Sequence, residues 1–337
     1  MSRWLFLLVA ILVSAAPLSF DQGDSTLLAA DDESAEPRLP PTPRFKTDPR
    51  KVLRGESDTQ ALDAPSGAGL AQRYPRDRNI ENDPDVVFAA DFEQEAWLSR
   101  WSYVDQAPTF ETIESAPGLG FQPLVGRALQ VVIPQGQKSG LNLLYKFKQE
   151  IGEEPEEIFF RYYLRLGNDW APTVQGGKLP GIAGTYGKAG WGGRPSDGRN
   201  GWSMRGSFGL LGTQGAPPGR TPVGTYAYHA RMGGRYGDGW SWTMGGPGSL
   251  ARDRWYCIEQ QVKMNSMRWD DGLMRVWIDG ELAFEQGSVR YRDIETLKID
   301  RIWMNVYHGG TAVSPQDQHV FMDNVVVARR YIGPMAQ

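Results

Sequence analysis

Short stretches in which apolar and polar residues alternate recur along the chain from about residue 85 onward. In the segment Glu156–Leu166, the residues Ile158, Phe160, Tyr162 and Leu164 occupy every second position, so they share one face of a strand. Similar stretches of strand length cover residues 85–93, 126–134, 139–148, 254–265, 272–286, 299–310 and 319–331. No long stretch carries a helical period, so the pattern predicts an all-β fold.

The connections between these stretches are short and rich in turn-forming residues. The Asp-Gly pair inside Ile278–Glu281 predicts a tight hairpin turn between two antiparallel strands. Residues 94–101 predict at most one short helical turn. Many short strands with tight turns are typical of an antiparallel β-sandwich, and we expect a single β-jelly-roll domain over residues 85–332.

The N-terminal part of the chain differs in composition from the rest. Arg3 precedes an apolar run over Trp4–Val13, and the small residues up to Ala15 fit a cleavage site. We therefore expect a signal peptide over residues 1–20, cleaved near Ala15, rather than a membrane anchor, because a span needs roughly 20 apolar residues. The mature protein is then secreted, periplasmic or on the cell surface, with no insertion into the membrane. Residues 21–84, rich in Pro and charge, predict a disordered linker.

Charge and cysteine content exclude several classes of function. The net charge is −4 and no basic block stands out, which argues against a nucleic-acid partner. The chain has one cysteine, so it forms no internal disulfide. Cys257 lies within a predicted strand, where a buried core thiol is expected rather than a nucleophile or metal ligand.

Three short motifs concentrate polar side chains at strand spacing. The first is GGKLPG, in which Lys178 stands between glycines and a proline, where no helix can form. The second is WSMRG, with Ser203 and Arg205 two residues apart, and the third is TYAYH, with Tyr226 and Tyr228 two apart. Each pair shares one face of a strand. Adjacent strands would then present a polar, cationic and aromatic surface.

The order of these motifs resembles that of polysaccharide lyase family 14, over about residues 85–331. The resemblance implies a concanavalin A-like β-jelly roll and a lyase acting on alginate or another uronate polymer. It also implies that Lys178, the Ser203–Arg205 pair and the Tyr226–Tyr228 pair form the functional set. The segment between Arg205 and Tyr226 looks longer than the family's usual hairpin.

The chemistry of a uronate lyase suits these residue types. Such an enzyme neutralises the C6 carboxylate, removes the C5 proton and protonates the leaving glycosidic oxygen, which needs no metal or other cofactor. Arg205 and Ser203 are expected to hold the carboxylate. Lys178 is either the base or the charge neutraliser, and Tyr226 or Tyr228 is the acid and also a candidate base. Trp202 and Trp191 are expected to contact the sugar rings.

Two other functions compete with this reading. A carbohydrate-binding module would stack sugars on aromatic side chains such as Trp240 and Trp242, but it has no need of the Lys, Arg and Tyr set. A glycoside hydrolase needs two carboxylates on one face of a strand, and Gln261 stands where the second would be. The sequence therefore favours the lyase and leaves the particular uronan, endo or exo action and the oligomeric state open.

The remaining candidates stand apart from the three motifs. His308 is a reserve candidate for the base, whereas His229 is expected to be structural and His319 to lie in a surface loop. The three histidines lack the spacing of a zinc site. Asp91 and Asp323 are candidates for holding a structural calcium ion.

Overall fold

The computed structural model describes residues 64–65, 68–105, 109–209, 218–246 and 248–336. All of these residues belong to one compact unit. The expected signal peptide and most of the expected linker lie outside the described residues, and so does part of the long segment between Arg205 and Tyr226.

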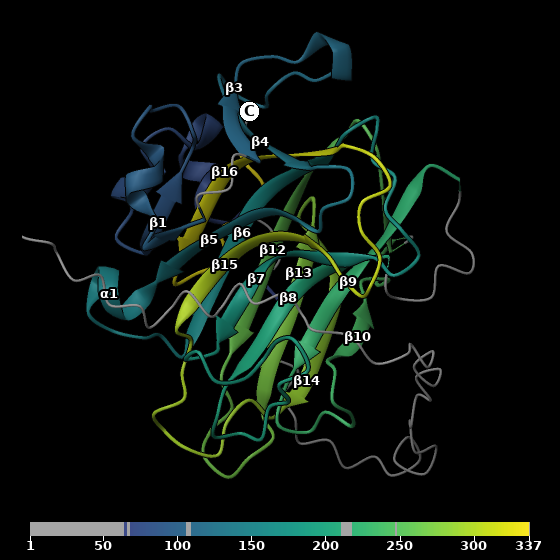
Figure 1. Cartoon of the computed structure of the whole chain (residues 1–337). Helices are drawn as coiled ribbons and strands as arrows, with labels where there is room; N and C mark the ends of the chain where they lie inside the picture. The colour runs from purple at the N-terminus through teal and green to yellow at the C-terminus, as the bar shows by residue number, and fades with distance from the viewer. Residues whose placement is uncertain (1–63, 66–67, 106–108, 210–217, 247, 337) are drawn as a thin grey trace, which may run out of the picture. The chain divides into compact units, whose positions relative to one another are not determined.

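Within these residues the chain forms two antiparallel sheets of eight strands each (Figure 1). The first sheet has the order β14 (Glu281–Val289), β13 (Gly272–Ile278), β12 (Trp255–Lys263), β6 (Glu157–Leu166), β16 (Gln318–Ala328), β4 (Ala128–Ile133) and β3 (Phe110–Ile113), and β1 (Val86–Ala90) also pairs with β16. The second has the order β10 (Asp238–Ser241), β9 (Arg220–Tyr228), β8 (Trp202–Phe208), β7 (Gly177–Gly184), β15 (Arg301–His308), β5 (Ser139–Lys146) and β2 (Tyr103–Val104), and β11 (Ser249–Ala251) also pairs with β9. Helical turns are short, as at η5 (Trp97–Arg100), η6 (Pro117–Leu119) and α1 (Phe147–Ile151). The predicted all-β jelly-roll sandwich is confirmed.

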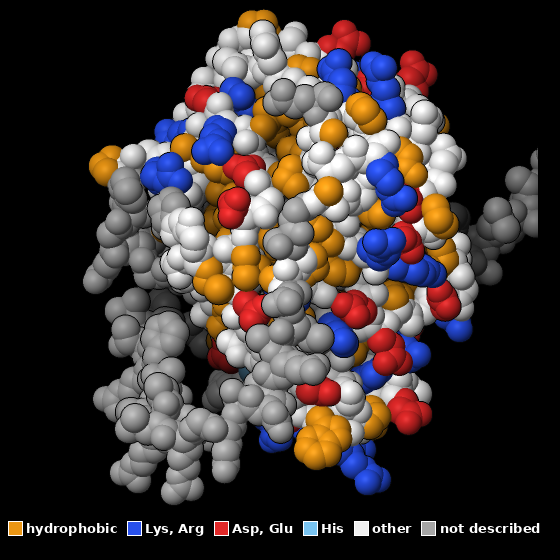
Figure 2. Space-filling view, turned by 180° about the vertical axis from the view of Figure 1, so that it is seen from behind, with side chains coloured by type: hydrophobic (Ala, Val, Ile, Leu, Met, Phe, Trp, Pro, Cys, Tyr) orange, Lys and Arg blue, Asp and Glu red, His pale blue; other side chains and the backbone are white. Residues whose placement is uncertain are grey.

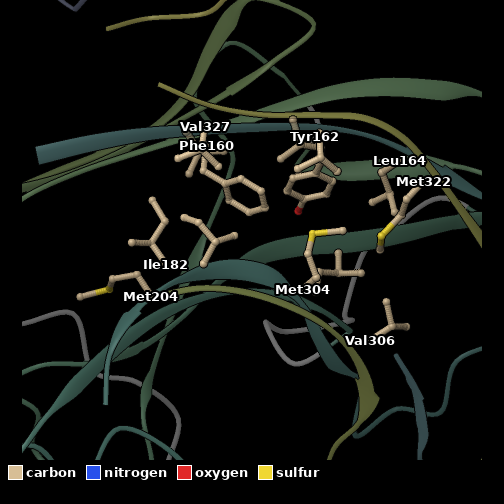
Figure 3. Close-up of a cluster of buried hydrophobic side chains, with 14 of the residues drawn as sticks. Phe160, Tyr162, Leu164, Ile182, Met204, Met304, Val306, Met322 and Val327 are labelled. Carbon is tan, nitrogen blue, oxygen red and sulfur yellow. The ribbon is translucent and has the colours of Figure 1, made fainter. Parts of the chain in front are cut away.

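The core lies between the two sheets and follows the alternation seen in the sequence. Phe160, Tyr162 and Leu164 of β6 point from the first sheet toward Ile182 and Met304 of the second (Figure 3). Each of these side chains is almost completely buried. Removal of this much apolar surface from water is the main contribution that holds the two sheets together.

The hairpin between β13 and β14 has the turn that its sequence predicts. Asp279 and Gly280 both have positive φ, at 53° and 86°. Two positive φ values in a two-residue loop match the right-handed twist of the flanking strands. The Asp279 carboxylate also accepts a hydrogen bond from the backbone N–H of Cys257 at 2.8 Å, which ties the turn to β12.

Strand β7 runs through the middle of the second sheet and contains a proline. Proline has no N–H to donate, and it is normally confined to edges and bulges. Here the pairing with β8 breaks between Leu179 and Gly181, so that Pro180 is an extra residue in β7. Because of this bulge, Leu179 and Ile182 both face the core although they are three residues apart. Lys178 lies just before the bulge and faces the opposite side of the sheet.

The domain begins earlier in the sequence than predicted. Residues 70–82 form three short 3₁₀ helices, η2 (Leu70–Arg73), η3 (Pro75–Asp77) and η4 (Ile80–Asn82). Leu70 and Ile80 are buried in a cluster with Phe159 and Trp277, on the outer face of the first sheet. The prediction of a disordered linker up to residue 84 is therefore wrong for this part. The first sheet already presents an apolar outer face, and a few apolar residues of this segment suffice to cover it. The segment therefore needs no periodic pattern of apolar residues that the sequence could reveal.

Candidate active site

Strand β7 places Lys178 on the outer face of the second sheet. Its ammonium lies over two aromatic rings, with Nζ 4.8 Å from the ring centre of Tyr226 and 5.5 Å from that of Tyr307. The side chain is 8% exposed. A cation held over the faces of desolvated rings is attracted by their π-electrons. Strand β7 thus holds the lysine in one place at the surface of the sheet.

Arg205 reaches the same surface from β8. Its Cζ lies 4.5 Å from the ring centre of Trp303, and the residue directly across from it on β9 is Tyr226. The Trp303 ring is fixed in turn, because its Nε1 donates to Oδ1 of Asn142 at 2.8 Å. The sheet therefore presents two cations, Lys178 and Arg205, on an aromatic floor.

Tyr226 and Tyr228 lie side by side at the end of β9. Their ring centres are 5.5 Å apart and the rings are nearly perpendicular, at 81°. The backbone N–H of Gly193 donates to the Tyr228 hydroxyl at 3.2 Å. The loop that contains Gly193 therefore closes over this tyrosine, and the predicted set of Lys178, Arg205 and the two tyrosines is brought together on one face.

The surroundings of the two tyrosines act differently on their proton affinities. Burial raises the pKa of Tyr226 and its neighbour Tyr228 raises it further, whereas the Arg205 charge and the Gly237 backbone act to lower it. Burial also raises the pKa of Tyr228, but the Gly193 N–H, the Tyr226 side chain and the Arg205 charge oppose the rise. A phenolate is therefore better stabilised at Tyr228 than at Tyr226. Both tyrosines carry their protons at neutral pH in the free protein.

Two residues expected to bind substrate are engaged elsewhere. Ser203 has no exposed surface, and its hydroxyl donates to the Gly190 carbonyl at 2.6 Å. Trp202 points into the core, where its Nε1 donates to the Lys298 carbonyl at 3.1 Å. Neither side chain is presented to a ligand. Ser203 holds the Gly193 loop, and Trp202 packs the sandwich, because neighbouring residues of a strand face opposite sides.

Trp191 remains at the surface, in the loop between β7 and β8. It is partly buried, and the guanidinium of Arg194 lies 4.7 Å from its ring centre. The other two aromatic candidates pack in or against the core. Trp242 is buried and donates to the Thr225 hydroxyl at 2.9 Å, and Trp240 stacks on Phe284 of the first sheet.

Strand β15 contributes residues that the sequence analysis did not single out. Trp303, Asn305 and Tyr307 alternate with the core residues of this strand and line the outer face beside Lys178 and Arg205. Asn305 donates to the Leu141 carbonyl at 3.0 Å. The alternation within residues 299–310 was visible, but only the sheet order places β15 next to β7.

His308 lies on the core side of β15 and cannot serve as the reserve base. It has no exposed surface, and its Nε2 lies 3.1 Å from the Gln318 amide. Burial and the Lys178 charge lower its pKa, so the ring is neutral and inaccessible to a substrate.

The other two histidines pair with carboxylates away from this cluster. His229 Nε2 contacts Asp238 Oδ2 at 2.9 Å, and His319 Nδ1 contacts Asp169 Oδ2 at 2.5 Å. His229 thus has the structural setting that was expected of it. His319 is part of β16 and pairs with Val132 of β4, so the prediction that it lies in a surface loop is wrong.

The two candidates for a calcium ion are in different settings. Asp323 is fully buried and accepts a hydrogen bond from the Asn324 N–H at 2.8 Å, whereas Asp91 is exposed. The residues that the structure describes contain no group of three or more His, Cys, Asp or Glu side chains that could hold a metal.

The comparison with known families bears on the last third of the chain. Residues 229–325 match the family model of Polysaccharide lyase 14. The resemblance to polysaccharide lyase family 14 is thus confirmed, and so is the prediction of a polysaccharide lyase. The match begins directly after Tyr228, so the placement of Lys178, Arg205 and the two tyrosines rests on the geometry above.

Solved alginate lyases share the fold. Alginate lyase Aly36B is 18% identical, with a TM-score of 0.57 over 73% of this chain and 98% of that one. The alginate lyase vAL-1 from Chlorella virus is 18% identical, with a TM-score of 0.54 over 72% and 99%. The marine PL-14 alginate lyase from Aplysia kurodai is 15% identical, with a TM-score of 0.53 over 72% and 98%. No curated protein matches the chain.

Proposed function

We propose that this polysaccharide lyase cleaves a uronate-containing polysaccharide by β-elimination. The observation that carries the proposal is the cluster of Lys178, Arg205, Tyr226 and Tyr228 on one sheet face. It combines two cations with two proton-transfer groups in a largely buried setting. Such a setting strengthens the attraction of the cations for a carboxylate.

The residues divide the reaction among them. Arg205 and Lys178 bind the C6 carboxylate and neutralise its charge, which makes the C5 proton acidic. Tyr228 has no exposed surface in the free protein, so the substrate must displace the Gly193 loop that covers it. Tyr228, as the phenolate, then removes that proton. The electrons of the C5–H bond form the C4–C5 double bond, and the C4–O bond breaks. Tyr228 then returns the proton to the leaving oxygen, so that the proton count balances. Tyr226 stabilises the phenolate through its side chain.

The geometry also supports the lyase over its two rivals. A retaining or inverting hydrolase needs a pair of carboxylates about 5–10 Å apart. Glu259 is the carboxylate of the strand in which the hydrolase pattern was considered, two residues before Gln261. It lies in the first sheet and accepts hydrogen bonds from the backbone N–H groups of Ile332 and Gly333, both at 2.8 Å. A binding module would need no buried lysine over a tyrosine ring.

The polymer that we propose is alginate or glucuronan-like. A variant of alginate lyase Aly36B has been solved in complex with alginate tetrasaccharide, and that relation suggests alginate as the first candidate. We also propose that the protein is exported, on the strength of the signal-like segment at residues 1–20. No helix in the described part of the chain is long and apolar enough to cross a membrane.

The test is an absorbance assay with the full chain. Alginate, glucuronan, pectate and a neutral glucan are incubated separately, and near-ultraviolet absorbance is followed. β-Elimination leaves a double bond conjugated to the carboxylate, which absorbs there, whereas hydrolysis does not. We expect absorbance to rise with one or more uronans and not with the neutral glucan.

Two lysine variants separate catalysis from general charge. Lys178→Ala should lose turnover at an unchanged melting temperature, whereas Lys148→Ala, at an exposed lysine of α1, should behave as the parent. New reducing ends without absorbance would identify a hydrolase. Binding to a polysaccharide without either signal would identify a binding module, and a fully active Lys178→Ala variant would overturn the assignment of the site.

A further inference from the structure

A hydrogen bond crosses the core of the sandwich directly beneath the catalytic surface. Nε2 of Gln260, in β12 of the first sheet, donates to the carbonyl of Pro180, in β7 of the second, at 2.9 Å. Gln260 is completely buried, and its neighbours on the same strand face, Ile258 and Val262, are core residues. An amide is thus placed where an apolar side chain would be expected.

The bulge in β7 explains why this carbonyl needs a partner. Pairing with β8 breaks between Leu179 and Gly181, and pairing with β15 breaks between Trp303 and Tyr307. The Pro180 carbonyl therefore turns away from both neighbouring strands and into the core. A buried carbonyl without a partner is costly, because it gives up its hydrogen bonds to water. Gln260 supplies the missing donor from the opposite sheet.

The same bulge sets the position of Lys178. Lys178 precedes it by two residues, and a regular strand would change which side chains face the core. On the other side of the bulge, the backbone of Gly181 packs closely against β8. A Cβ at this position would collide with the Met204 carbonyl and the Arg205 backbone. A change in the bulge would therefore move Lys178 and Arg205 relative to each other.

We propose that Gln260 is a positioning residue for the lyase reaction. It holds the Pro180 carbonyl, the bulge holds Lys178, and Lys178 meets the carboxylate of the uronate. This inference rests on the proposed function of Lys178. Gln260 itself touches no substrate, because the full thickness of the second sheet lies between it and the outer face.

Tyr291 provides a matched control in another part of the core. Its side chain is completely buried, and its hydroxyl donates to the Leu273 carbonyl at 2.9 Å. Removal of this hydroxyl also takes a side-chain donor from a backbone carbonyl, but not from the carbonyl of Pro180 in the bulge. Tyr162 is unsuitable, because its hydroxyl interacts with Gln260 itself.

The kinetic test uses Gln260→Leu, which keeps the size and loses the donor. We expect kcat to fall roughly 10- to 100-fold with KM nearly unchanged, because misplacement by about 1 Å has effects of this size. Tyr291→Phe should keep the parent kcat. In a double-mutant cycle with Lys178→Arg, the two losses should not add. Additive losses, or equal losses in the Tyr291 variant, would overturn the proposal.

A second variant covers the case in which leucine prevents folding. Gln260→Glu has nearly the same shape, and it donates to the Pro180 carbonyl only while its carboxyl carries a proton. Its kcat relative to the parent should therefore fall as the pH rises. If the ratio of the two kcat values stays constant over the pH range in which both proteins are folded, the role of residue 260 as a hydrogen-bond donor is contradicted.

A spectroscopic readout separates this proposal from the proposed function. The chain contains four Pro–Gly pairs, at residues 117–118, 180–181, 218–219 and 247–248. With ¹³C-carbonyl proline and ¹⁵N-glycine, a carbonyl–amide correlation spectrum therefore shows at most four signals. Gln260→Leu should shift the Pro180–Gly181 signal alone, and a spectrum without this shift would overturn the positioning role. Full activity of Lys178→Ala would instead contradict the proposed function and leave this shift in place.

Discussion

At the scale of single residues, the site depends on where one ammonium group is held. The Lys178 Nζ lies over the rings of Tyr226 and Tyr307, and on its remaining side it lies close to Gly309. A Cβ at residue 309 would come within 2.6 Å of Nζ. The absence of a side chain at Gly309 is therefore part of what positions the lysine.

Substitution of Gly309 by alanine tests this directly. The backbone of Gly309 does not need a positive φ, and the group it would meet is the mobile end of a side chain, so Nζ should move while the fold stays intact. We expect kcat to fall by roughly 100-fold with a melting temperature close to that of the parent. Gly287→Ala, at an exposed position with no atom near the added Cβ, is the control. Equal activity of the two variants would show that the position of Nζ is not critical.

The tyrosine pair predicts a dependence of the rate on pH. Because the pKa of Tyr228 is raised, its phenolate is a minor form at neutral pH, and kcat/KM should increase up to tenfold per pH unit in the alkaline range. The Tyr226 side chain lowers the pKa of Tyr228, so Tyr226→Phe should shift the rise to higher pH, and Tyr228→Phe should abolish turnover. Initial rates across pH 6–10 measure both effects. A Tyr228→Phe variant that stays active would make Tyr226 or Lys178 the base.

At the scale of elements, the N-terminal 3₁₀ helices and the C-terminal segment hold each other against the first sheet. The N–H groups of Leu70 and Ala71 donate to the carbonyls of Tyr331 and Ile332, at 3.1 and 2.9 Å. Asp77 forms a buried ion pair with Arg161 of β6. A segment of low apolar content is thus part of the folded domain through backbone and charge contacts.

Two truncations distinguish this arrangement from a linker. Removal of residues 1–63 should leave the melting temperature unchanged. Removal of residues 1–84 should expose Phe159 and Trp277 and leave the Arg161 charge without Asp77, and loss of one partner of a buried pair alone costs about 3–5 kcal/mol. We expect the shorter protein to melt at least 10 °C lower, or not to fold. Equal melting temperatures would show that the segment contributes nothing to stability.

At the scale of the whole molecule, the two sheets have different tasks. The second sheet presents the candidate site on its outer face, whereas the outer face of the first is covered by the terminal segments. On the face seen in Figure 2, acidic and basic side chains are interspersed around a band of hydrophobic ones.

Glu259 predicts how the stability of the domain depends on pH. Burial raises its pKa to about 7, although the Ile332 and Gly333 N–H groups and Arg161 act to lower it. A carboxyl whose pKa is higher in the folded state contributes stability that is complete below its ordinary pKa and is lost as the pH rises through about 7. Its contribution to the free energy of unfolding should therefore fall between pH 5 and 8, by at most about 3 kcal/mol.

Urea unfolding at the two pH values measures this contribution. The parent should lose more stability between pH 5 and 8 than Glu259→Gln, whose amide does not titrate. Asp271→Asn, at an exposed carboxyl, serves as the control and should follow the parent. If Glu259→Gln has the same pH dependence as the parent, the carboxyl is ionised throughout, held by its two N–H donors.

Much of this protein follows from local pattern. The strands β6, β12 and β16 lie within the alternating stretches, because a strand with one face in the core must alternate. The turn at Asp279 and Gly280 follows from the conformations that these residues allow. The spacing of Tyr226 and Tyr228 places them on one face because residues two apart in a regular strand share a face. The pairing of β8 with β9 is what sets Arg205 beside them.

Other features depend on contacts between distant parts of the chain. Trp202 and Ser203 sit beside the functional residues in sequence, yet the sheet faces bury one in the core and engage the other with a loop carbonyl. His308 lies next to Tyr307, but on the other side of the strand. The order of strands brings β15 next to β7, and the packing of two sheets brings Gln260 beneath Pro180. Alternation gives the two faces of each strand, but only the assembled sheets decide which face meets the core, because burial is a property of neighbours that the local sequence does not contain.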